Sequence, residues 1–414
     1  MICYTECSHC RLCGGKDLQQ VFDLGFQSIG SVFPKLTSDQ DPPLAPLSIV
    51  MCKKCELVQL QHTVQSNELY TDSYGYRSGL NNTMINHLKG IANYAMEFVS
   101  IIPDTVILDI GCNDGTLLGH YPKCGGKVGI DPCGKQFQEH HSADIHLEAD
   151  FFSKGVYPVS EFAKPSIVTS ISMFYDLPDP TGFAKDVADI LDDNGVWIME
   201  QSYVYTMLER NSFDTICHEH LEYYGLKQID YICKEAGLKI IDVSFNDING
   251  GSFRVAIAKQ QSVFIPTEAV HQVLTFEANL NVLELFMQFT KRIEIEKEKL
   301  MSFIEGSKKE GKTLAIYGAS TKGNTLLQYY GINVDLINYG IAERNPRKYG
   351  CRTPCTRIPI SSEEHVRALK PDYMLVLPWH FKTEFLSREE NYLRNGGKLV
   401  FPLPYFEICE FIQA

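Results

Sequence analysis

Two cysteine pairs near the start of the chain have the spacing of metal ligands. Cys10 and Cys13 form one CxxC pair, and Cys52 and Cys55 form the second. Four thiolates bind Zn²⁺ tetrahedrally, and a module of about 60 residues without a large core gains its fold from such binding. We therefore expect these four cysteines to hold a structural zinc ion. The gap between the pairs is unusually long, and other possible ligands lie nearby: Cys3, Cys7 and His9.

A glycine-rich turn follows the apolar, strand-like run at 106–110. Gly111 and Gly115 allow the backbone to approach a ligand where a Cβ would collide, and a helix expected after them presents free amide groups. Asp131 ends the next strand-like run, where its carboxylate can accept hydrogen bonds from both hydroxyls of a ribose. This layout predicts a nucleoside-containing cofactor, and it could hold NAD.

The acidic character of the turn favours S-adenosylmethionine (SAM) over NAD. The pattern is DxGxxxG rather than GxGxxG. SAM is cationic and has no pyrophosphate, so a turn that carries Asp109 and Asp114 suits it better than a dinucleotide. The other predicted cofactor residues lie in this turn or at the ends of neighbouring strands: Asn113, Asp150, Phe151, Ser172 and Gln201. For the pair at 150–151, adenine contacts compete with an ordinary surface aspartate beside a core phenylalanine.

A third group, HEH at 218–220, lies shortly after the strand-like run that ends at Gln201. This places it beyond the carboxyl edge of the expected sheet, where a substrate would meet the methyl group. Its spacing is not that of HExxH, so acid/base chemistry is favoured over a metal site. A satisfied structural histidine is the ordinary alternative for either ring alone.

A second glycine-containing loop, at 318–323, follows another strand-like run and resembles a phosphate-binding loop. Lys322 would supply the counter-charge, and Glu343 could hold a ribose. Further residues of this predicted substrate-binding site are Ser320, Asn324, Arg344, Trp379 and His380. The loop lacks the second glycine of a true dinucleotide loop, so a degenerate fold retained for packing is the alternative.

The elements that carry these residues predict an α/β fold. A helix is expected from about residue 81 to Pro103. Strand-like runs then alternate with helical or loop segments up to Ala258, as in a doubly wound parallel sheet. A long helical region at about 267–309 would connect this sheet to a second α/β unit. We expect three domains: a zinc-binding module at 1–66, a class I methyltransferase domain at 67–262 and a Rossmann-like domain at 263–414.

Composition narrows the classes of function. The chain has 414 residues, 44% hydrophobic and 21% charged, with a formal net charge of −13. Nucleic-acid binding is disfavoured because it needs a basic stripe, and no apolar stretch reaches the length of a membrane span. The first residues lack a secretory signal, which favours the cytoplasm and makes disulfides unexpected.

These blocks, in this order, resemble the nucleotide-sugar C-methyltransferases of deoxysugar biosynthesis, the group that includes D-tetronitrose C-3'-methyltransferase. The resemblance covers essentially the whole chain. Beside the CxxC pairs it includes YGYRSG at 74–79 and these blocks: ILDIGCNDGTLL, HEHLEYYGL, NGGSFRV, YGASTKGNTLLQY, ERNPRKYG, TRIPI, VLPWHF and NGGKLVFPLP.

The resemblance implies a C-terminal domain that binds the nucleotide diphosphate of a 4-keto-6-deoxy sugar, whose C3 is methylated through an enolate. It also implies that Tyr76 lies over the SAM site. Within this chemistry we assign His220 as the base and Glu219 as the group that orients it or tunes its pKa. The partner would be a small-molecule nucleotide-diphosphate sugar, and a monomer is the default expectation.

Two positions depart from the family pattern. Tyrosine is usual immediately before HEH, and this chain has Cys217, whose thiol is a weaker hydrogen-bond donor than a phenol. Tyr223 or Tyr224 would then have to assist, or the sugar differs. Cys355 stands where glycine is more usual. O- or N-methylation of another metabolite, or a non-catalytic SAM-binding scaffold, remain alternatives.

Overall fold

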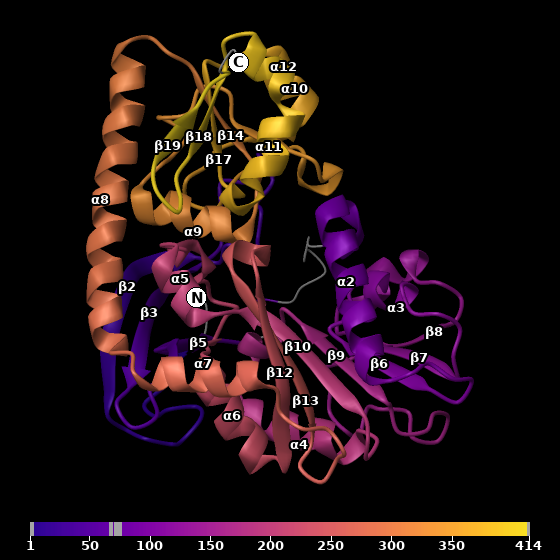
Figure 1. Cartoon of the computed structure of the whole chain (residues 1–414). Helices are drawn as coiled ribbons and strands as arrows, with labels where there is room; N and C mark the ends of the chain where they lie inside the picture. The colour runs from indigo at the N-terminus through magenta and orange to yellow at the C-terminus, as the bar shows by residue number, and fades with distance from the viewer. Residues whose placement is uncertain (1–3, 66–68, 70–76, 412–414) are drawn as a thin grey trace.

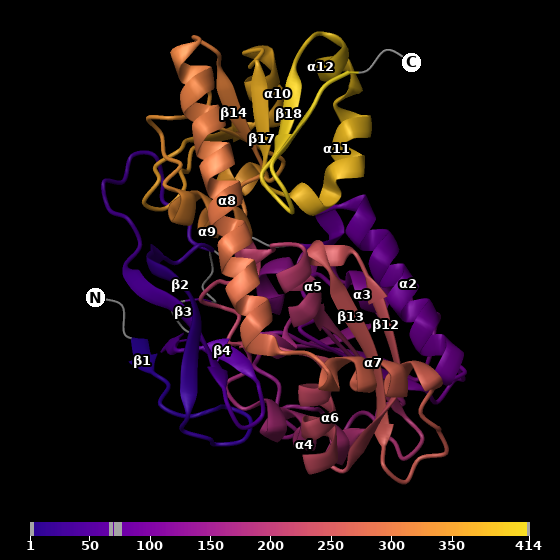
Figure 2. The ribbon, with the colours of Figure 1, turned by 60° about the vertical axis from the view of Figure 1, so that its left-hand side comes forward.

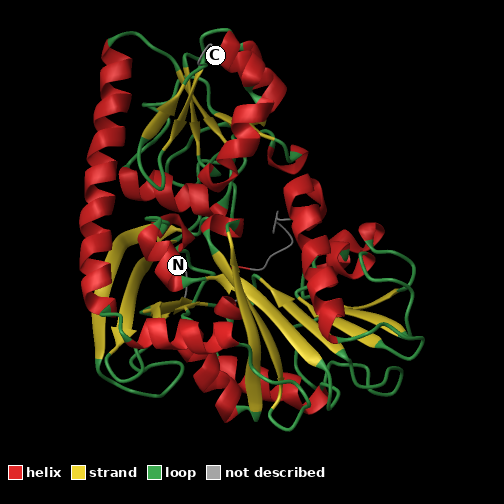
Figure 3. Ribbon diagram, viewed as in Figure 1, coloured by secondary structure: helices red, strands yellow, loops and turns green. Residues whose placement is uncertain are grey.

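The computed structural model describes residues 4–65, 69 and 77–411, and its strands form four sheets (Figures 1 and 3). The N-terminal sheet is antiparallel, in the order β11-β4-β3-β2. Its strands are β2 (Leu18–Ser28), β3 (Leu44–Cys52), β4 (Val58–Leu60) and β11 (Glu222–Tyr223), and the short β1 (Tyr4–Glu6) and β5 (His62–Val64) pair beside it. The fourth strand therefore comes from the region of the HEH block and not from the N-terminal segment.

The central sheet has seven strands in the order β12-β13-β10-β9-β6-β7-β8. The strands are β6 (Val106–Ile110), β7 (Gly126–Ile130), β8 (Ile145–Glu148), β9 (Ile167–Ile171), β10 (Val196–Ser202), β12 (Leu238–Asn246) and β13 (Ser252–Lys259). The five from β8 to β10 are parallel, and β13 is antiparallel to both of its neighbours. The predicted doubly wound sheet is confirmed. β12 was not identified from the sequence.

Both faces of the central sheet are buried. Successive side chains of β6 show this, since they pack into different hydrophobic cores. Ile107 belongs to the cluster with Leu88 and Ile91 of α2, whereas Leu108 belongs to the cluster with Val187 of α4. This explains why β6 reads as a continuous apolar run instead of an alternating one. The helices of this region are α2 (Asn82–Phe98), α3 (Thr116–Gly119), α4 (Pro180–Ile190), α5 (Val204–Glu209) and α6 (Leu226–Glu235).

The helical region at 267–309 is divided in two, α7 (Glu268–Ala278) and α8 (Val282–Lys309). The division occurs because the Asn281 side chain caps α8 by accepting from the amide of Glu284. α8 runs along the N-terminal sheet and on to the C-terminal one (Figure 2), and Phe289 packs on Phe22 of β2 with ring centroids 5.3 Å apart. No helix in the described ranges has both the length and the apolar character to cross a membrane.

The C-terminal sheet has six strands in the order β16-β15-β14-β17-β18-β19, parallel except for β19. They are β14 (Leu314–Tyr317), β15 (Ile341–Glu343), β16 (Ile360–Ser362), β17 (Tyr373–Val376), β18 (Lys398–Phe401) and β19 (Glu407–Cys409). Its helices are α9 (Thr321–Tyr330), α10 (Glu363–Ala368), α11 (Lys382–Arg388) and α12 (Glu390–Arg394). The predicted second α/β unit is confirmed, with α9 directed toward the central sheet (Figure 1).

Candidate active site and zinc centre

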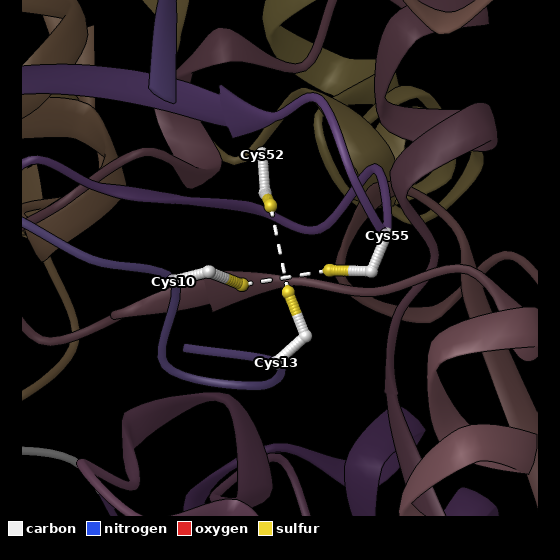
Figure 4. A group of neighbouring side chains, drawn as sticks. All are labelled: Cys10, Cys13, Cys52 and Cys55. Carbon is white, nitrogen blue, oxygen red and sulfur yellow. Dashed lines mark hydrogen bonds between the residues drawn. The ribbon is translucent and has the colours of Figure 1, made fainter. Parts of the chain in front are cut away.

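The four cysteines of the two CxxC pairs converge on one point (Figure 4). Their Sγ atoms lie within 4.8 Å of one another, with Cys10 3.5 Å from Cys55 and Cys13 3.6 Å from Cys52. A Cβ on Gly15 would lie 3.2 Å from the sulfur of Cys52, so a residue with a side chain would crowd the ligands. Four thiolates fill a tetrahedral shell and leave no position for a substrate. The group fits a structural zinc ion.

The competing ligands do not join this group. Cys7 and His9 are outside the cluster of four, and the Cys7 thiol donates to the carbonyl of His9. Cys3 lies outside the described residues. The long gap between the pairs is occupied by β2 and β3, a hairpin that carries Cys52 at its end. The strands therefore close the sequence gap in space.

The turn after β6 has the backbone shape that its glycines predict. Gly111, Asn113 and Gly115 have φ values of 77°, 50° and 74°, in the left-handed region. A Cβ at Gly111 would lie 3.1 Å from the Met173 side chain, so this position has no space for one. The amide of Asn113 donates to Asp131 Oδ2 at 2.8 Å. The turn and the end of β7 are thus tied together at the carboxyl edge of the sheet.

The predicted cofactor carboxylates differ in their surroundings. Asp131 is buried, and its other oxygen, Oδ1, accepts from the amide of Cys133 at 2.7 Å. Asp109 accepts from the Thr169 hydroxyl at 2.6 Å inside the sheet, and burial raises the pKa of its carboxyl to about 7. Asp109 therefore braces the sheet, whereas Asp131 lies at its edge.

Asp114 binds the segment that precedes α2. Its Oδ2 accepts from the amide of Gly79 at 2.9 Å and lies 3.6 Å from Arg77 Nε. Asn113 Oδ1 accepts in parallel from the amide of Ser78 at 3.0 Å. The segment 77–79 is therefore fastened over the turn. Tyr76, the next residue upstream, lies outside the described residues, so its predicted position over the SAM site stays a prediction.

The remaining predicted cofactor residues fall into two groups. Ser172 and Gln201 lie at the same edge of the sheet as the turn. Ser172 has a φ of 54°, and both amide atoms of Gln201 are buried without a hydrogen-bond partner among the described residues. A buried amide in this state requires a ligand or water. Asp150 and Phe151 are exposed after β8, with Phe151 53% exposed.

His220 is held in one tautomer. Its Nδ1 lies 2.7 Å from the Thr215 carbonyl, and because a carbonyl only accepts, Nδ1 carries the proton and Nε2 carries the lone pair. The ring packs against Tyr175 with centroids 4.1 Å apart. Burial, and next the positive charge of Lys322, lower the pKa of His220 to about 3. The ring is therefore uncharged near neutral pH and offers Nε2 as a proton acceptor.

The structure separates the roles of the other two members of HEH. His218 is buried and its Nε2 donates to the Ala45 carbonyl of β3 at 3.3 Å, so this ring faces the N-terminal sheet. Glu219 is also buried, and its charge, after burial, raises the pKa of the Cys217 thiol. The Thr215 carbonyl is the hydrogen-bond partner of His220 Nδ1, and the role of Glu219 in orienting that ring or tuning its pKa stays a prediction.

Tyr223 lines a small cavity together with His220. The cavity has a volume of about 10 Å³, room for roughly one water. Its lining residues are Tyr175, Ser202, Tyr203, Val204, Met207, Thr215, His220, Glu222 and Tyr223. Burial raises the pKa of Tyr223, so its phenol remains protonated. The cavity is too small for a sugar, and Tyr223 faces the interior behind His220.

Lys322 of α9 connects the C-terminal sheet with this region. Its Nζ donates to the Asn249 carbonyl at 2.7 Å. Burial lowers the pKa of Lys322, and the charge of Asp214 acts in the opposite direction. After burial, the charge of Lys322 is the next cause that lowers the pKa of His220. The predicted phosphate counter-charge is thus directed at the HEH region.

Trp379 and His380 approach the same place from the loop after β17. Trp379 Nε1 donates to Asp214 Oδ2 at 2.9 Å, and a Cβ at Gly250 would lie 3.0 Å from the indole ring. Trp379 is therefore a contact between the two α/β units. Burial, and then the charge of Lys322, lower the pKa of His380 to about 3, and its Nδ1 has no hydrogen-bond partner among the described residues.

The other predicted substrate residues make local contacts. The Ser320 hydroxyl caps α9 by accepting from the amide of Gly323 at 3.0 Å. Asn324 donates to the Gly30 carbonyl at 2.6 Å, and Glu343 Oε2 accepts from the amide of Ala319 at 2.8 Å. In a separate position, Arg344 pairs with two acidic side chains, Glu363 and Glu384, each at 3.3 Å. The two ion pairs of Arg344 do not place it beside Lys322.

Several residues of the site carry no strong sequence signal. Thr215 contributes only its carbonyl, and Glu222 and Arg11 meet from sequence positions far apart. Asn249, with a φ of 57°, stands in the NGGSFRV block, which could have marked it. Lys348, in ERNPRKYG, donates to the Ala319 carbonyl at 2.6 Å beneath the 318–323 loop.

Comparison with known families gives three matches that follow one another along the chain. Residues 10–70 match a zinc binding domain, residues 88–243 a methyltransferase domain, and residues 247–404 a C-methyltransferase C-terminal domain. The C-methyltransferase NovU of Streptomyces niveus is 28% identical over 404 residues, which is 95% of each chain. The similarity to this relative therefore extends over all three regions.

Three solved structures resemble part of the chain. A complex of the Haloferax volcanii Trm112 methyltransferase activator with a methyltransferase gives a TM-score of 0.36 at 15% identity, covering 44% of this chain and 94% of that one. Mitomycin 7-O-methyltransferase gives 0.35 at 13% identity, covering 43% and 54%. The magnesium protoporphyrin IX methyltransferase of Synechocystis with bound SAM gives 0.32 at 11%, covering 42% and 79%.

The family matches agree in order with the three parts of the structure. The four-thiolate centre lies within the zinc-binding match, and the turn after β6 lies within the methyltransferase match. Strands β14 to β18 of the C-terminal sheet lie within the match to the C-methyltransferase C-terminal domain, and β19 lies beyond its end. The chain is a SAM-dependent C-methyltransferase with an N-terminal zinc-binding region, a middle methyltransferase domain and a C-terminal C-methyltransferase domain.

Proposed function

We propose that the enzyme methylates C3 of a nucleotide-linked 4-keto-6-deoxy sugar and so forms a branched-chain deoxysugar. Carbon methylation requires a carbon nucleophile, and a ketone at C4 acidifies the hydrogen on C3. A base that removes this hydrogen and a cation that stabilises the enolate oxygen are then sufficient. The observation that carries the proposal is His220, with its lone pair on Nε2 and the charge of Lys322 nearby.

In the proposed reaction, His220 Nε2 accepts the C3 proton, and the electron pair of the broken C–H bond forms the enolate. The donor, when bound, supplies an electrophilic methyl group to that carbon. The Thr215 carbonyl stabilises the imidazolium through Nδ1, and Lys322 offsets the charge on the enolate oxygen. The proton then leaves Nε2 for solvent.

The low pKa of His220 does not prevent this role. Burial lowers the pKa first and the charge of Lys322 second, so part of the lowering depends on that charge. When an enolate or a phosphate oxygen neutralises that ammonium group, the pKa of the ring rises because the repulsion between two cations is removed. Proton transfer and charge neutralisation therefore favour each other.

The SAM site would use Asp131, with the turn at 111–115, Ser172 and Gln201 completing it. The nucleotide diphosphate would lie at the N-terminus of α9 near Lys322 and His380. Asp150, Phe151 and Tyr76 are proposed adenine or donor contacts. We propose domain boundaries at 66 and 262, although the N-terminal sheet also contains β11 from the middle region. Cys217 replaces the usual phenol, and we propose that Tyr223, which lines the same cavity as the base, assists instead.

The test is incubation with SAM and dTDP-4-keto-6-deoxyglucose in deuterated water. The proposed reaction gives a product with a new C–CH₃ bond and without the original C3 hydrogen, detected by mass spectrometry and NMR. O-methylation would retain that hydrogen and would refute the proposal. A SAM-binding scaffold would form no methylated product with any 4-keto sugar nucleotide.

His220→Asn tests the assigned base. We expect kcat to fall by about a thousandfold, because an amide cannot accept the proton, while the affinity for SAM measured by calorimetry stays within about twofold. His271→Asn is the matched control, since His271 is exposed on α7. Retained activity of His220→Asn would remove His220 as the base.

A further inference from the structure

The strand that follows HEH belongs to the zinc-binding region by its pairing. In the antiparallel pair of β11 with β4, Glu222 faces Gln59 and Tyr223 faces Val58. The amide of Leu60 donates to the Leu221 carbonyl at 2.8 Å just before this pair. The segment that directly follows the proposed base is therefore an added strand on the N-terminal sheet, and its position depends on that sheet.

Arg11 lies between the first two zinc ligands and reaches this strand pair. Its Nη1 donates to the Leu60 carbonyl at 2.7 Å, and its Nη2 donates to the Thr63 hydroxyl at 2.7 Å. Its Nε lies 3.5 Å from Glu222 Oε1, and its side chain is 5% exposed. Nη1 also lies 3.5 Å from the Leu221 carbonyl. One guanidinium group thus joins both strands.

The backbone of Arg11 is held in place independently of its side chain. Its amide donates to Gln59 Oε1 at 2.9 Å, and the Cys10 amide donates to the Gly15 carbonyl at 2.7 Å. The residues on either side of it in the knuckle include two of the four ligands, Cys10 and Cys13. Metal binding therefore fixes the origin of the side chain that reaches β11.

The contact continues from β11 to the base. Glu222 is buried, neither of its oxygens has a hydrogen-bond partner among the described residues, and Arg11 is the cation paired with it. Leu221 donates its amide to the Tyr175 carbonyl at 2.7 Å, and the Tyr175 ring packs on His220 at 4.1 Å. Glu222, Tyr175 and His220 also line the same small cavity.

We propose that Arg11 is a positioning residue for the methyl-transfer site. It couples the zinc knuckle to Leu221 and Glu222, and through Tyr175 to the ring of His220. The zinc centre then has a function beyond the stability of its own module, because it fixes the strand that directly follows the base. The inference rests on the proposed function of His220 as the base.

The second knuckle supplies a matched control. Lys53 follows Cys52 as Arg11 follows Cys10, but its side chain is 51% exposed and pairs only with the exposed Asp17 at 3.2 Å. The variants are Arg11→Met, Arg11→Lys, Arg11→Met combined with Glu222→Gln, and Lys53→Met. The full-length zinc-loaded protein is used throughout.

Four measurements are made on each variant: zinc content, SAM affinity by calorimetry, amide hydrogen exchange of residues 216–225, and kcat and KM with dTDP-4-keto-6-deoxyglucose as the probe. For Arg11→Met we expect unchanged zinc content and SAM affinity, exchange of 216–225 at least about tenfold faster, and kcat lower on the order of a hundredfold with KM within about threefold. Arg11→Lys keeps the charge and should retain more activity, and Lys53→Met should match the wild type.

The double variant distinguishes positioning from loss of fold. Glu222→Gln replaces the buried acid, which Arg11→Met leaves without its cation, by a neutral amide of similar shape, so kcat should recover at least about fivefold over Arg11→Met. The proposal would be overturned if residues 216–225 of Arg11→Met exchanged at the wild-type rate. It would also be overturned if exchange at residues 106–130 accelerated by the same factor, or if this variant lost its zinc. If the wild type does not turn over the probe, the proposed substrate is wrong, while the exchange and zinc measurements still decide the role of Arg11.

Discussion

The uncharged state of His220 predicts a loss of stability in mild acid that a single substitution should remove. Burial, with the charge of Lys322, lowers the pKa of this ring from 6.5 to about 3. In the unfolded chain the ring regains its ordinary pKa, so the unfolded state binds a proton that the folded state excludes. Stability is therefore complete above the unfolded pKa and is lost as the pH falls from about 6.5 toward 3.

The magnitude follows from the two pKa values. A pH of 5 is about 1.5 units below the pKa of the unfolded ring, so that ring is protonated, while the folded ring is still neutral. Each unit corresponds to about 1.4 kcal/mol, so this ring lowers the free energy of unfolding by up to about 2 kcal/mol between pH 8 and pH 5. His220→Asn cannot be protonated, and its loss of stability over this interval should be smaller by that amount.

The assay is urea unfolding at both pH values, followed by the fluorescence of the buried Trp197 and Trp379. Comparing the two pH values within each variant cancels any packing defect that the substitution introduces. The exposed His271→Asn is the control and should lose as much stability as the wild type. An equal acid loss in His220→Asn and wild type would refute the reasoning, because the ring would then titrate near its ordinary pKa in the folded protein.

Three further predictions concern charge, packing and metal. Lys322→Met removes a cation that lowers the pKa of His220, so the pKa of that ring should rise and the acid limb of the kcat/KM profile should move to higher pH. The value of kcat should also fall about a hundredfold, because the enolate loses its counter-charge. An acid limb that does not move would contradict this prediction. Trp379→Phe leaves Asp214 without its indole donor and should destabilise the protein by about 1–3 kcal/mol in urea unfolding, and a neutral effect would exclude the bond as a stabilising contact. Cys13→Ala removes one of four thiolates and should lower the zinc content below one ion per chain and the melting temperature with it, whereas full zinc occupancy would show that another ligand substitutes.

The elements that were predicted correctly are those with local signals. The strand at 106–110, its glycine turn and α2 follow from apolar runs and from residues adjacent in sequence. The CxxC pairs contain two ligands each within four residues, so half of the zinc centre is local. β12 was missed, and the division between α7 and α8 at Asn281 was also missed although an asparagine cap is a local signal.

Residue type indicated candidate polar groups, whereas their hydrogen-bond partners were decided by the fold. Ser320 and Glu343 were expected to bind ligand, and in the structure they bond to amides at the start of α9. Glu219 was expected to orient His220, and in the structure the Thr215 carbonyl is the hydrogen-bond partner of His220 Nδ1. A backbone carbonyl has no signature in the sequence, because every residue has one.

By itself, the sequence determined which chemical groups the protein possesses and the order of its three parts: thiolates for a metal, an acidic glycine turn for a cationic methyl donor, and imidazoles shortly after a strand. Only the tertiary structure decided what holds the His220 ring and which tautomer it adopts. Arg11 and Glu222 are 211 positions apart along the chain by their numbering, yet they form one ion pair across β4 and β11. Such contacts arise because chain folding brings distant segments together, and the pKa, tautomer and position of a side chain depend on those neighbours.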